Sequence, residues 1–121
     1  MKLQALRGAI TCDEDSRAEI ESKTSRLVKE LLARNELTND DLVSILFTTT
    51  PDLHAAYPAG AARTALGLDD VALMGAQEQE VDDGLHRCIR VMVHCYTDRP
   101  RSELQHVFLE GATALRPDLP Q

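Results

Sequence analysis

An arginine lies in the middle of an otherwise apolar run, and this feature constrains the fold most strongly. Residues 88–93 have the sequence Cys-Ile-Arg-Val-Met-Val, and no turn signal follows until Asp98 and Pro100. Such a run of β-branched and sulfur-containing side chains predicts a buried strand over residues 87–97. A guanidinium group stays charged at any accessible pH, so burying Arg90 without a partner would be costly. An anionic group must therefore meet Arg90, either a carboxylate of this chain or a ligand.

The length and composition predict one soluble globular domain that covers residues 1–121. The chain is 43% apolar and 27% charged, which is ordinary for a globular protein. Its net charge of −7 argues against a general nucleic-acid binder, which needs a basic surface. No apolar stretch is long enough to span a membrane and no secretory leader is expected, so we expect a cytoplasmic location. The odd number of cysteines predicts reduced thiols at Cys12, Cys88 and Cys95.

The first part of the chain predicts a strand followed by a long helix. Residues 2–11 predict a strand on which Arg7 shares a face with Leu3, Ala5 and Ala9. Residues 16–34 predict a helix, and Ser16 with Glu19 fits a capping box at its start. Its apolar stripe consists of Ile20, Leu27, Val28, Leu31 and Leu32.

The elements that follow are shorter. We expect strands over residues 42–50, 71–76 and 105–110, a short strand near 112–115, and a helix over 59–66 that ends at Gly67. The connections are a polar turn over 35–41, an acidic segment over 77–84 and a polar turn over 98–103. The terminal residues 116–121 contain two prolines and are expected to form a mobile tail.

These elements predict an α+β fold with one long and one short helix on a mixed sheet. Two helices of unequal length cannot cover both faces of a sheet of about five strands. A second copy of the chain is the natural cover for the remaining face, so the pattern predicts a symmetric oligomer.

The sequence contains none of the common catalytic motifs. A glycine-rich phosphate loop, a serine elbow and an HExxH motif are all missing. A zinc site is not expected, because Cys88 and His94 share the strand face of Arg90 while Cys95 points the other way. We therefore expect no metal and no cofactor. The acidic run over residues 78–83 predicts a solvated connection, except that Glu78 lies where it can reach a ligand hydroxyl or Arg90.

Arginines remain as the candidate functional residues. Arg7 and Arg90 lie within predicted strands, Arg63 lies on the short helix, and Arg116 lies in the tail. Several arginines with one or two acids and no nucleophile suit a small ligand that has more than one carboxylate. They also suit a reaction that needs shape and charge rather than a covalent step.

Five segments of the chain match the pattern of a known protein family in their order and spacing. They are Arg7-Gly-Ala, Thr50-Pro-Asp-Leu-His-Ala-Ala-Tyr-Pro-Ala59, Gln77-Glu78, Cys88-Ile-Arg-Val-Met92 and Leu115-Arg-Pro-Asp-Leu119. Together they span nearly the whole chain, which closely resembles the monofunctional chorismate mutases of the small trimeric class. This resemblance implies a trimeric pseudo-α/β barrel, not the all-helical fold of the other class.

The resemblance also implies a reaction, the [3,3] rearrangement of chorismate to prephenate in phenylalanine and tyrosine biosynthesis. By resemblance, Arg90 would stabilise negative charge on the ether oxygen in the transition state. Arg7 would bind a carboxylate, and Glu78 would bind the ring hydroxyl. No covalent intermediate and no cofactor are implied, and the pocket would hold the substrate in a compact shape.

In the family that the chain resembles, neighbouring subunits of a homotrimer share each active site. The implied substrate-binding residues are Tyr57, Ala59, Arg63, Leu73, Met74, Gly75, Phe108, Leu115 and Arg116. Three residues depart from the family pattern: Phe108 replaces a common tyrosine, Gly75 a common cysteine and Gly60 a common lysine. Because these changes remove polar contacts and a cation, we expect an active enzyme with a raised KM.

A second hypothesis is a protein without this activity. It would be a trimeric small-anion-binding protein or a domain similar to the imine deaminases, which have a similar shape. The presence of Arg7, Glu78 and Arg90 together favours the enzyme, because a sensor does not need a cation at the ether oxygen.

Overall fold

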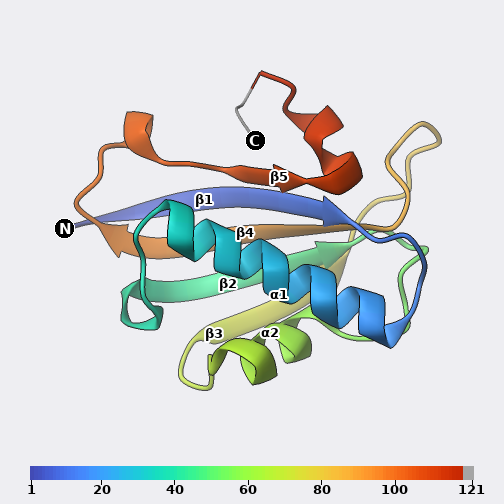
Figure 1. Cartoon of the computed structure of the whole chain (residues 1–121), viewed down its shortest axis with the longest axis horizontal. Helices are drawn as coiled ribbons and strands as arrows, with labels where there is room; N and C mark the ends of the chain where they lie inside the picture. Colours follow the sequence, from blue (N-terminus) through green and yellow to red (C-terminus); the bar gives the residue numbers. More distant parts are fainter. Residues whose placement is uncertain (119–121) are drawn as a thin grey trace.

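The computed structural model describes residues 1–118, which form a mixed sheet with two helices on one face (Figure 1). The strands are β1 (Lys2–Thr11), β2 (Leu42–Thr49), β3 (Ala72–Gln77), β4 (Cys88–Thr97) and β5 (Val107–Leu109). The helices are α1 (Arg17–Arg34) and α2 (Pro58–Leu66), with short 3-10 segments η1 (Asn39–Asp41), η2 (Arg101–Glu103) and η3 (Glu110–Leu115). The predicted α+β class is confirmed. No helix in this part of the chain is long and apolar enough to cross a membrane.

The strand that carries Arg90 lies in the middle of the sheet. The strand order is β3-β2-β4-β1-β5. β4 runs antiparallel to both β1 and β2, whereas the two outer strands pair in parallel with their neighbours. Pairing on both sides satisfies the backbone of β4, which explains why its sequence is apolar almost throughout.

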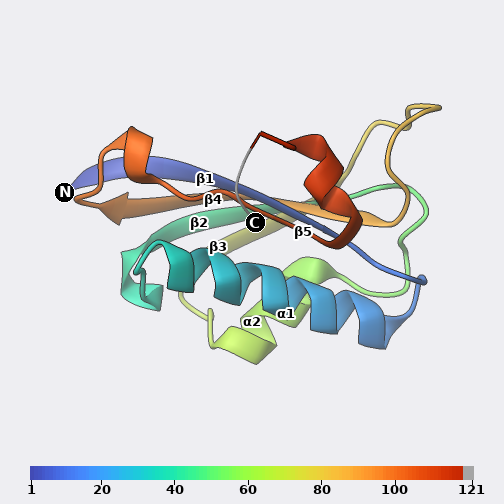
Figure 2. The same ribbon diagram turned by 45° about the horizontal axis from the view of Figure 1, so that its top comes forward.

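Both helices cover the same face of the sheet, as Figure 2 shows. Alternate residues of β4 point into this core, so that Ile89, Val91 and Val93 are almost completely buried. They pack against the predicted stripe of α1, of which only Leu32 is partly exposed. Burial of this apolar surface provides the main driving force for the fold.

Neither α-helix covers the opposite face of the sheet, where η3 packs against one end. Large apolar side chains are exposed there on four strands: Leu3 is 55% exposed, Leu46 38%, Met74 65% and Tyr96 46%. The prediction that one face would lack a helical cover is therefore confirmed. Several large apolar side chains exposed on one face of a sheet are typical of a protein interface.

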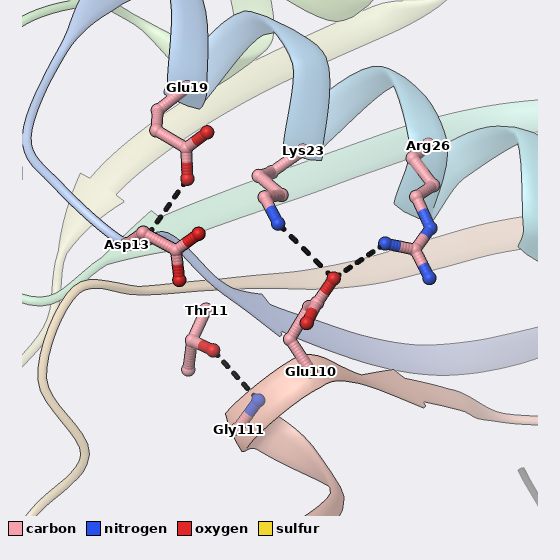
Figure 3. A network of polar contacts seen from close by, with 7 residues as sticks. All are labelled: Thr11, Asp13, Glu19, Lys23, Arg26, Glu110 and Gly111. Atoms are coloured by element: carbon pink, nitrogen blue, oxygen red, sulfur yellow. Dashed lines mark hydrogen bonds and ion pairs between the residues drawn. The ribbon is translucent and has the colours of Figure 1, made fainter.

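The start of α1 differs from its prediction in one detail. The Ser16 hydroxyl accepts a hydrogen bond from the Glu19 backbone N–H at 3.2 Å, as expected for an N-cap. The Glu19 carboxylate accepts from the Asp13 backbone N–H at 2.8 Å instead of from Ser16 (Figure 3). Only half of the predicted capping box forms, because the Glu19 carboxylate binds the beginning of the β1–α1 connection at Asp13. At the end of α2, Gly67 has a φ of 66°, which confirms the predicted left-handed cap.

The predicted short strand near residues 112–115 is wrong, because this segment belongs to η3. Strand β5 ends at Leu109, and Glu110 has a φ of 54° that turns the backbone away from the sheet. The Gly111 backbone N–H then donates to the Thr11 hydroxyl at 2.8 Å (Figure 3). A Cβ atom on Gly111 would lie 2.9 Å from that hydroxyl, so glycine is required for this close approach.

Ion pairs attach the start of η3 to helix α1. The Glu110 carboxylate lies 3.2 Å from Lys23 Nζ and 2.7 Å from Arg26 Nη1 (Figure 3). Hydrogen bonds from these two cations lower the pKa of Glu110. These ion pairs hold the segment that precedes the predicted mobile tail, residues 116–121, against helix α1. Of the tail itself, residues 119–121 lie outside the described residues.

Candidate active site

Arg90 lies on the face of the sheet that has no helical cover. Its neighbours across the strands are Ala9 on β1 and Thr48 on β2. Because side chains alternate along a strand, Ile89 and Val91 enter the core while Arg90 points away from it. The guanidinium is therefore half-buried, with 31% of the side chain exposed. Because the Arg90 side chain does not enter the core, the free-energy cost that was predicted for a buried, unpaired guanidinium does not arise.

The carboxylate that meets Arg90 is Glu78, the residue that directly follows β3. Glu78 Oε1 lies 2.9 Å from Arg90 Nε and accepts a hydrogen bond from the Thr48 hydroxyl at 2.6 Å. The Glu78 backbone N–H also donates to the Thr49 carbonyl at 2.8 Å, which continues the β2–β3 pairing by one residue. Arg90 Nε makes no hydrogen bond among the described residues, so the contact is an ion pair without an aligned donor. The charge of Arg90 is only partly satisfied, which leaves it able to bind a second anion.

The three predicted catalytic residues line one cavity, which we call the arginine cavity. It has a volume of about 210 Å³, and Arg7, Glu78 and Arg90 contribute its charged groups. Thr48 and the apolar side chains of β2 and β4 complete the wall. Two fixed cations and one carboxylate suit a small molecule that has both acidic groups and a hydroxyl.

A second group of predicted residues lines a different cavity, which we call the Tyr57 cavity. Its volume is about 580 Å³, and Tyr57, Ala59 and Gly75 lie in its wall with Arg17 and His54. The Tyr57 side chain is 85% exposed, which is unusual for an aromatic residue. A large exposed aromatic at the rim of a cavity is well placed to contact a ligand or another subunit.

The remaining predicted residues of this second group lie outside both cavities. Leu73 packs partly into the core beneath the helices, and Met74 is exposed on the opposite face. Arg63 is exposed on α2, where its carbonyl accepts the N–H groups of Gly67 and Leu68. The structure of one chain therefore does not bring Arg63, Leu73 and Met74 together with Arg90.

Phe108 lies beside the arginine cavity but is buried. It pairs with Ala9, the same residue that pairs with Arg90 on the other side, and is 2% exposed. It packs in a small cluster with Cys88 and Ala112, and Leu115 from η3 contacts the edge of this cluster. The 3-10 segment thus brings Leu115 next to Phe108.

Arg116 forms a two-pronged contact with Asp118. Its Nε and Nη2 atoms lie 3.1 Å and 2.9 Å from the two carboxylate oxygens. This hydrogen bonding raises the pKa of Arg116 and lowers the pKa of Asp118. In one chain, therefore, the guanidinium that the resemblance implies for substrate binding is paired with Asp118.

Two site residues were missed by the sequence analysis. Thr48 was treated as an ordinary strand residue, yet its hydroxyl orients Glu78. Asp52 directly follows the predicted strand 42–50 and Pro51, and both of its carboxylate oxygens accept the Arg87 backbone N–H at 3.0 and 2.9 Å, directly before β4 begins. Burial opposes ionisation of Asp52, but hydrogen bonds from Thr50 and Arg87 outweigh it and lower its pKa. Pro51-Asp52 after a strand was the available signal, since aspartate at a turn often accepts backbone N–H groups.

The cysteines play no part in the site as nucleophiles. All three are free and buried, as the odd count predicted. Burial raises the pKa of Cys12 and of Cys88 to about 11, in spite of the nearby Arg90 charge in the case of Cys88. They are therefore neutral thiols near pH 7 and pack as small apolar side chains. Among residues 1–118, no three histidine, cysteine or acidic side chains are grouped so that they could hold a metal ion.

Comparisons with known proteins agree with this geometry. Residues 3–119 match the family model described as chorismate mutase type I. The chain is 41% identical to chorismate mutase AroH of Bacillus subtilis strain 168 over 119 residues, which cover 98% of this chain and 94% of that protein.

The chain belongs to the type I chorismate mutase family.

Two further chorismate mutases support this placement. The AroH protein of Thermus thermophilus is 40% identical over 118 residues, which cover 97% of this chain and 96% of that protein. A solved chorismate mutase from Clostridium thermocellum superimposes with a TM-score of 0.89 at 44% identity, covering 92% of this chain and 98% of that one. The resemblance deduced from five sequence segments is confirmed, and the chain is a chorismate mutase in sequence and fold.

Proposed function

We propose that this chain catalyses the rearrangement of chorismate to prephenate through fixed charges, without a covalent intermediate. The observation that carries the proposal is the arginine cavity, where Arg7, Glu78 and Arg90 surround one space in a chain of this family. The substrate is a dicarboxylate with one ring hydroxyl. Two cations and a carboxylate are complementary to these groups.

Arg90 is proposed as the group that lowers the barrier. As the C–O bond of the substrate stretches, negative charge collects on the ether oxygen, and a fixed cation stabilises that charge more strongly in the transition state than in the ground state. Central placement on a strand with neighbours on both sides restricts the motion of the Arg90 backbone. A cation that is already oriented requires no reorganisation during the reaction.

Glu78 and Arg7 are proposed to orient the substrate. Thr48 donates to Glu78 Oε1 and so holds the carboxylate that would accept the ring hydroxyl. Arg7 would bind a substrate carboxylate from β1, on the same sheet face as Arg90. Holding the flexible side chain of the substrate against the ring provides the orientation effect that a unimolecular rearrangement can use.

The active site is proposed to form between subunits of a homotrimer. Within one chain the arginine cavity and the Tyr57 cavity are separate, and Arg63, Leu73 and Met74 line neither of them. The exposed apolar residues on the uncovered sheet face supply a surface for subunit contact. In a closed ring, the Tyr57 side of one chain can meet the arginine side of the next. The free thiols further support a proposed cytoplasmic location.

Three residues of the pocket are proposed to weaken substrate binding. Gly60 and Gly75 each leave room for a side chain, since an added Cβ would have its nearest neighbour at 3.9 Å in both cases. Phe108 lacks the hydroxyl group of a tyrosine, which could form a hydrogen bond with a ligand. Each lost polar contact corresponds to about 1 kcal/mol, so KM is expected to be raised while Arg90 catalysis is retained.

The direct experiment is to incubate the purified protein with chorismate and follow its absorbance together with prephenate formation. Acceleration over buffer by several orders of magnitude is expected. A rate equal to the buffer rate would refute the proposal. The alternatives, an anion-binding protein without activity or an imine-deaminase-like domain, have no observation in their favour among the family and structural matches.

A further inference from the structure

A histidine side chain continues the hydrogen-bonded pairing between β1 and β5. The two strands pair in parallel from Gly8 and Val107 to Ile10 and Leu109. One residue before this pairing begins, the backbone N–H of Arg7 donates to Nδ1 of His106 at 3.0 Å. The imidazole therefore accepts the N–H that the short strand β5 leaves without a backbone partner.

This hydrogen bond defines the protonation state of His106. An imidazole nitrogen that accepts a hydrogen bond carries no proton, so the ring is neutral with its proton on Nε2. Burial lowers the pKa of His106, and the nearby charges of Arg116 and Arg7 lower it further. The groups beside it on the uncovered face are His94 of β4 and Arg101 of η2, which line a cavity of about 430 Å³ with His106. None of these neighbours is an acid that would favour protonation.

The hydrogen bond to His106 is important because few other contacts among the described residues fix the position of the Arg7 side chain. Among residues 1–118, the Arg7 guanidinium has no ion-pair partner, in contrast to Arg90 with Glu78. Its direction into the arginine cavity therefore depends on the position of its own backbone. On one side the strand around Arg7 is fixed by the pairing of β1 with β4, in which Arg7 lies opposite Met92, and on the other side the Arg7 N–H is held by His106.

We propose that His106 is a positioning residue, which holds the Arg7 backbone so that its guanidinium faces a carboxylate of the substrate. The proposal rests on the proposed function for the identity of that substrate. His106 itself does not contact the reacting atoms. Its neutral imidazole acts through Arg7, so its effect is on substrate binding rather than on the chemical step.

Two substitutions test this role. His106→Leu removes the acceptor, whereas His106→Asn places an amide oxygen near the former Nδ1 position. We expect His106→Leu to raise KM about fivefold, the factor for one hydrogen bond of ordinary strength, with kcat within about twofold. His106→Asn should restore most of the wild-type KM. Equal damage by both substitutions, or an unchanged KM in His106→Leu, would overturn the proposal. His94→Asn, on the same face, is the matched control.

The pH dependence of KM provides a second readout. Both carboxylates of the substrate stay ionised above about pH 5. Wild-type KM should rise as the pH falls through the pKa of His106, because a protonated Nδ1 can no longer accept the Arg7 N–H. His106→Asn should lack this rise. A fall in KM at acid pH would overturn the proposal, since it would mean that a positive His106 attracts the substrate directly.

An NMR titration separates failure of this proposal from failure of the proposed function. In the ligand-free protein labelled with ¹⁵N, the Arg7 amide resonance should shift with the same apparent pKa as the His106 ring nitrogens. An Arg7 amide that does not respond to the His106 titration would overturn the inference even if the enzyme is active. The coupled shift is expected even if chorismate proves not to be the substrate.

Discussion

The arginine cavity and the Tyr57 cavity differ in what one chain can complete alone. In the arginine cavity the charged groups already face one another, with Glu78 held between Thr48 and Arg90. In the Tyr57 cavity the predicted contacts are an exposed aromatic ring, an alanine and a glycine. The first cavity has the groups needed for the chemistry, and the second has surfaces that can enclose a substrate. The difference shows that the charged groups are arranged within one chain, whereas in the proposed trimer the walls that enclose the substrate would be completed by a second chain.

The largest expected effect is on the charged side of this comparison. Arg90→Ala removes the cation at the ether oxygen, and kcat should fall by at least about a thousandfold. Arg90→Lys keeps the charge but loses the planar fork, so partial activity should remain. Steady-state kinetics with chorismate measures both values. Arg34→Ala, which removes a partly buried ion pair with Glu30 on α1, is the control and should leave kcat unchanged.

A mixing experiment tests whether the two cavities meet between subunits. Arg90→Ala inactivates the arginine cavity, and Ala59→Arg should block the Tyr57 cavity, so each variant alone should be inactive. After the two are unfolded together and refolded as a random mixture, about a quarter of the sites in a trimer should have both halves intact. Recovery of about that fraction of wild-type activity is expected. If the mixture stays inactive, the two cavities do not combine across an interface.

Glu78→Gln should have an intermediate effect. The substitution keeps a side-chain oxygen for Thr48 but removes the negative charge opposite Arg90, so the hydrogen bond to the ring hydroxyl weakens. A hydrogen bond to a charged group contributes about 1.5–3 kcal/mol, so kcat/KM should fall by about ten- to hundredfold. A thousandfold fall in kcat alone would instead make Glu78 an acid or base in the chemical step.

Gly60→Lys should improve substrate binding on the Tyr57 side. A Cβ at this position would lie 3.9 Å from its nearest neighbour, Tyr57 Cβ, so the helix can accept the side chain. The added cation near a dianionic substrate should lower KM severalfold and leave kcat unchanged. Arg17, which lines the same cavity, provides a control, since Arg17→Gln should change KM in the opposite direction. A change in kcat would show that the Tyr57 side takes part in the chemistry.

The smallest expected change is in the dependence of kcat on pH. Arginine does not titrate in the accessible range, and Cys12 and Cys88 have pKa values of about 11. From about pH 6 to 9, kcat should therefore vary by less than about twofold. A bell-shaped profile would indicate general acid–base catalysis instead.

The sequence predicted the elements whose periodicity is long and uniform. The stripe of α1, the apolar run of β4 and the glycine at the end of α2 each depend on local preferences, and each formed as predicted. Arg90 could be recognised because a charge within such a run requires a partner. Glu78 followed from its place at the end of a strand.

The features that the sequence did not predict depend on contacts between distant segments. Residues 112–115 have the composition of a strand, but the positive φ of Glu110 and the bond from Gly111 to Thr11 remove them from the sheet. The hydrogen bonds from the Arg7 backbone N–H to His106 and from the Thr48 hydroxyl to Glu78 join residues that are 99 and 30 positions apart. Strand register determines such pairs, and no local pattern in the sequence reports it.

The most direct test replaces the charge of Arg90 without changing its shape. Citrulline has nearly the same size and planar shape as arginine but is neutral, with a carbonyl oxygen in place of one guanidinium nitrogen. Because Cys88 begins β4, the variant can be made by ligating a segment that ends at Arg87 to a synthetic segment that starts at Cys88 and has citrulline at position 90. The same ligation with arginine is the control. We predict that kcat for chorismate falls by at least about a thousandfold while the protein still folds. A citrulline protein that keeps most of the kcat would contradict electrostatic catalysis by Arg90.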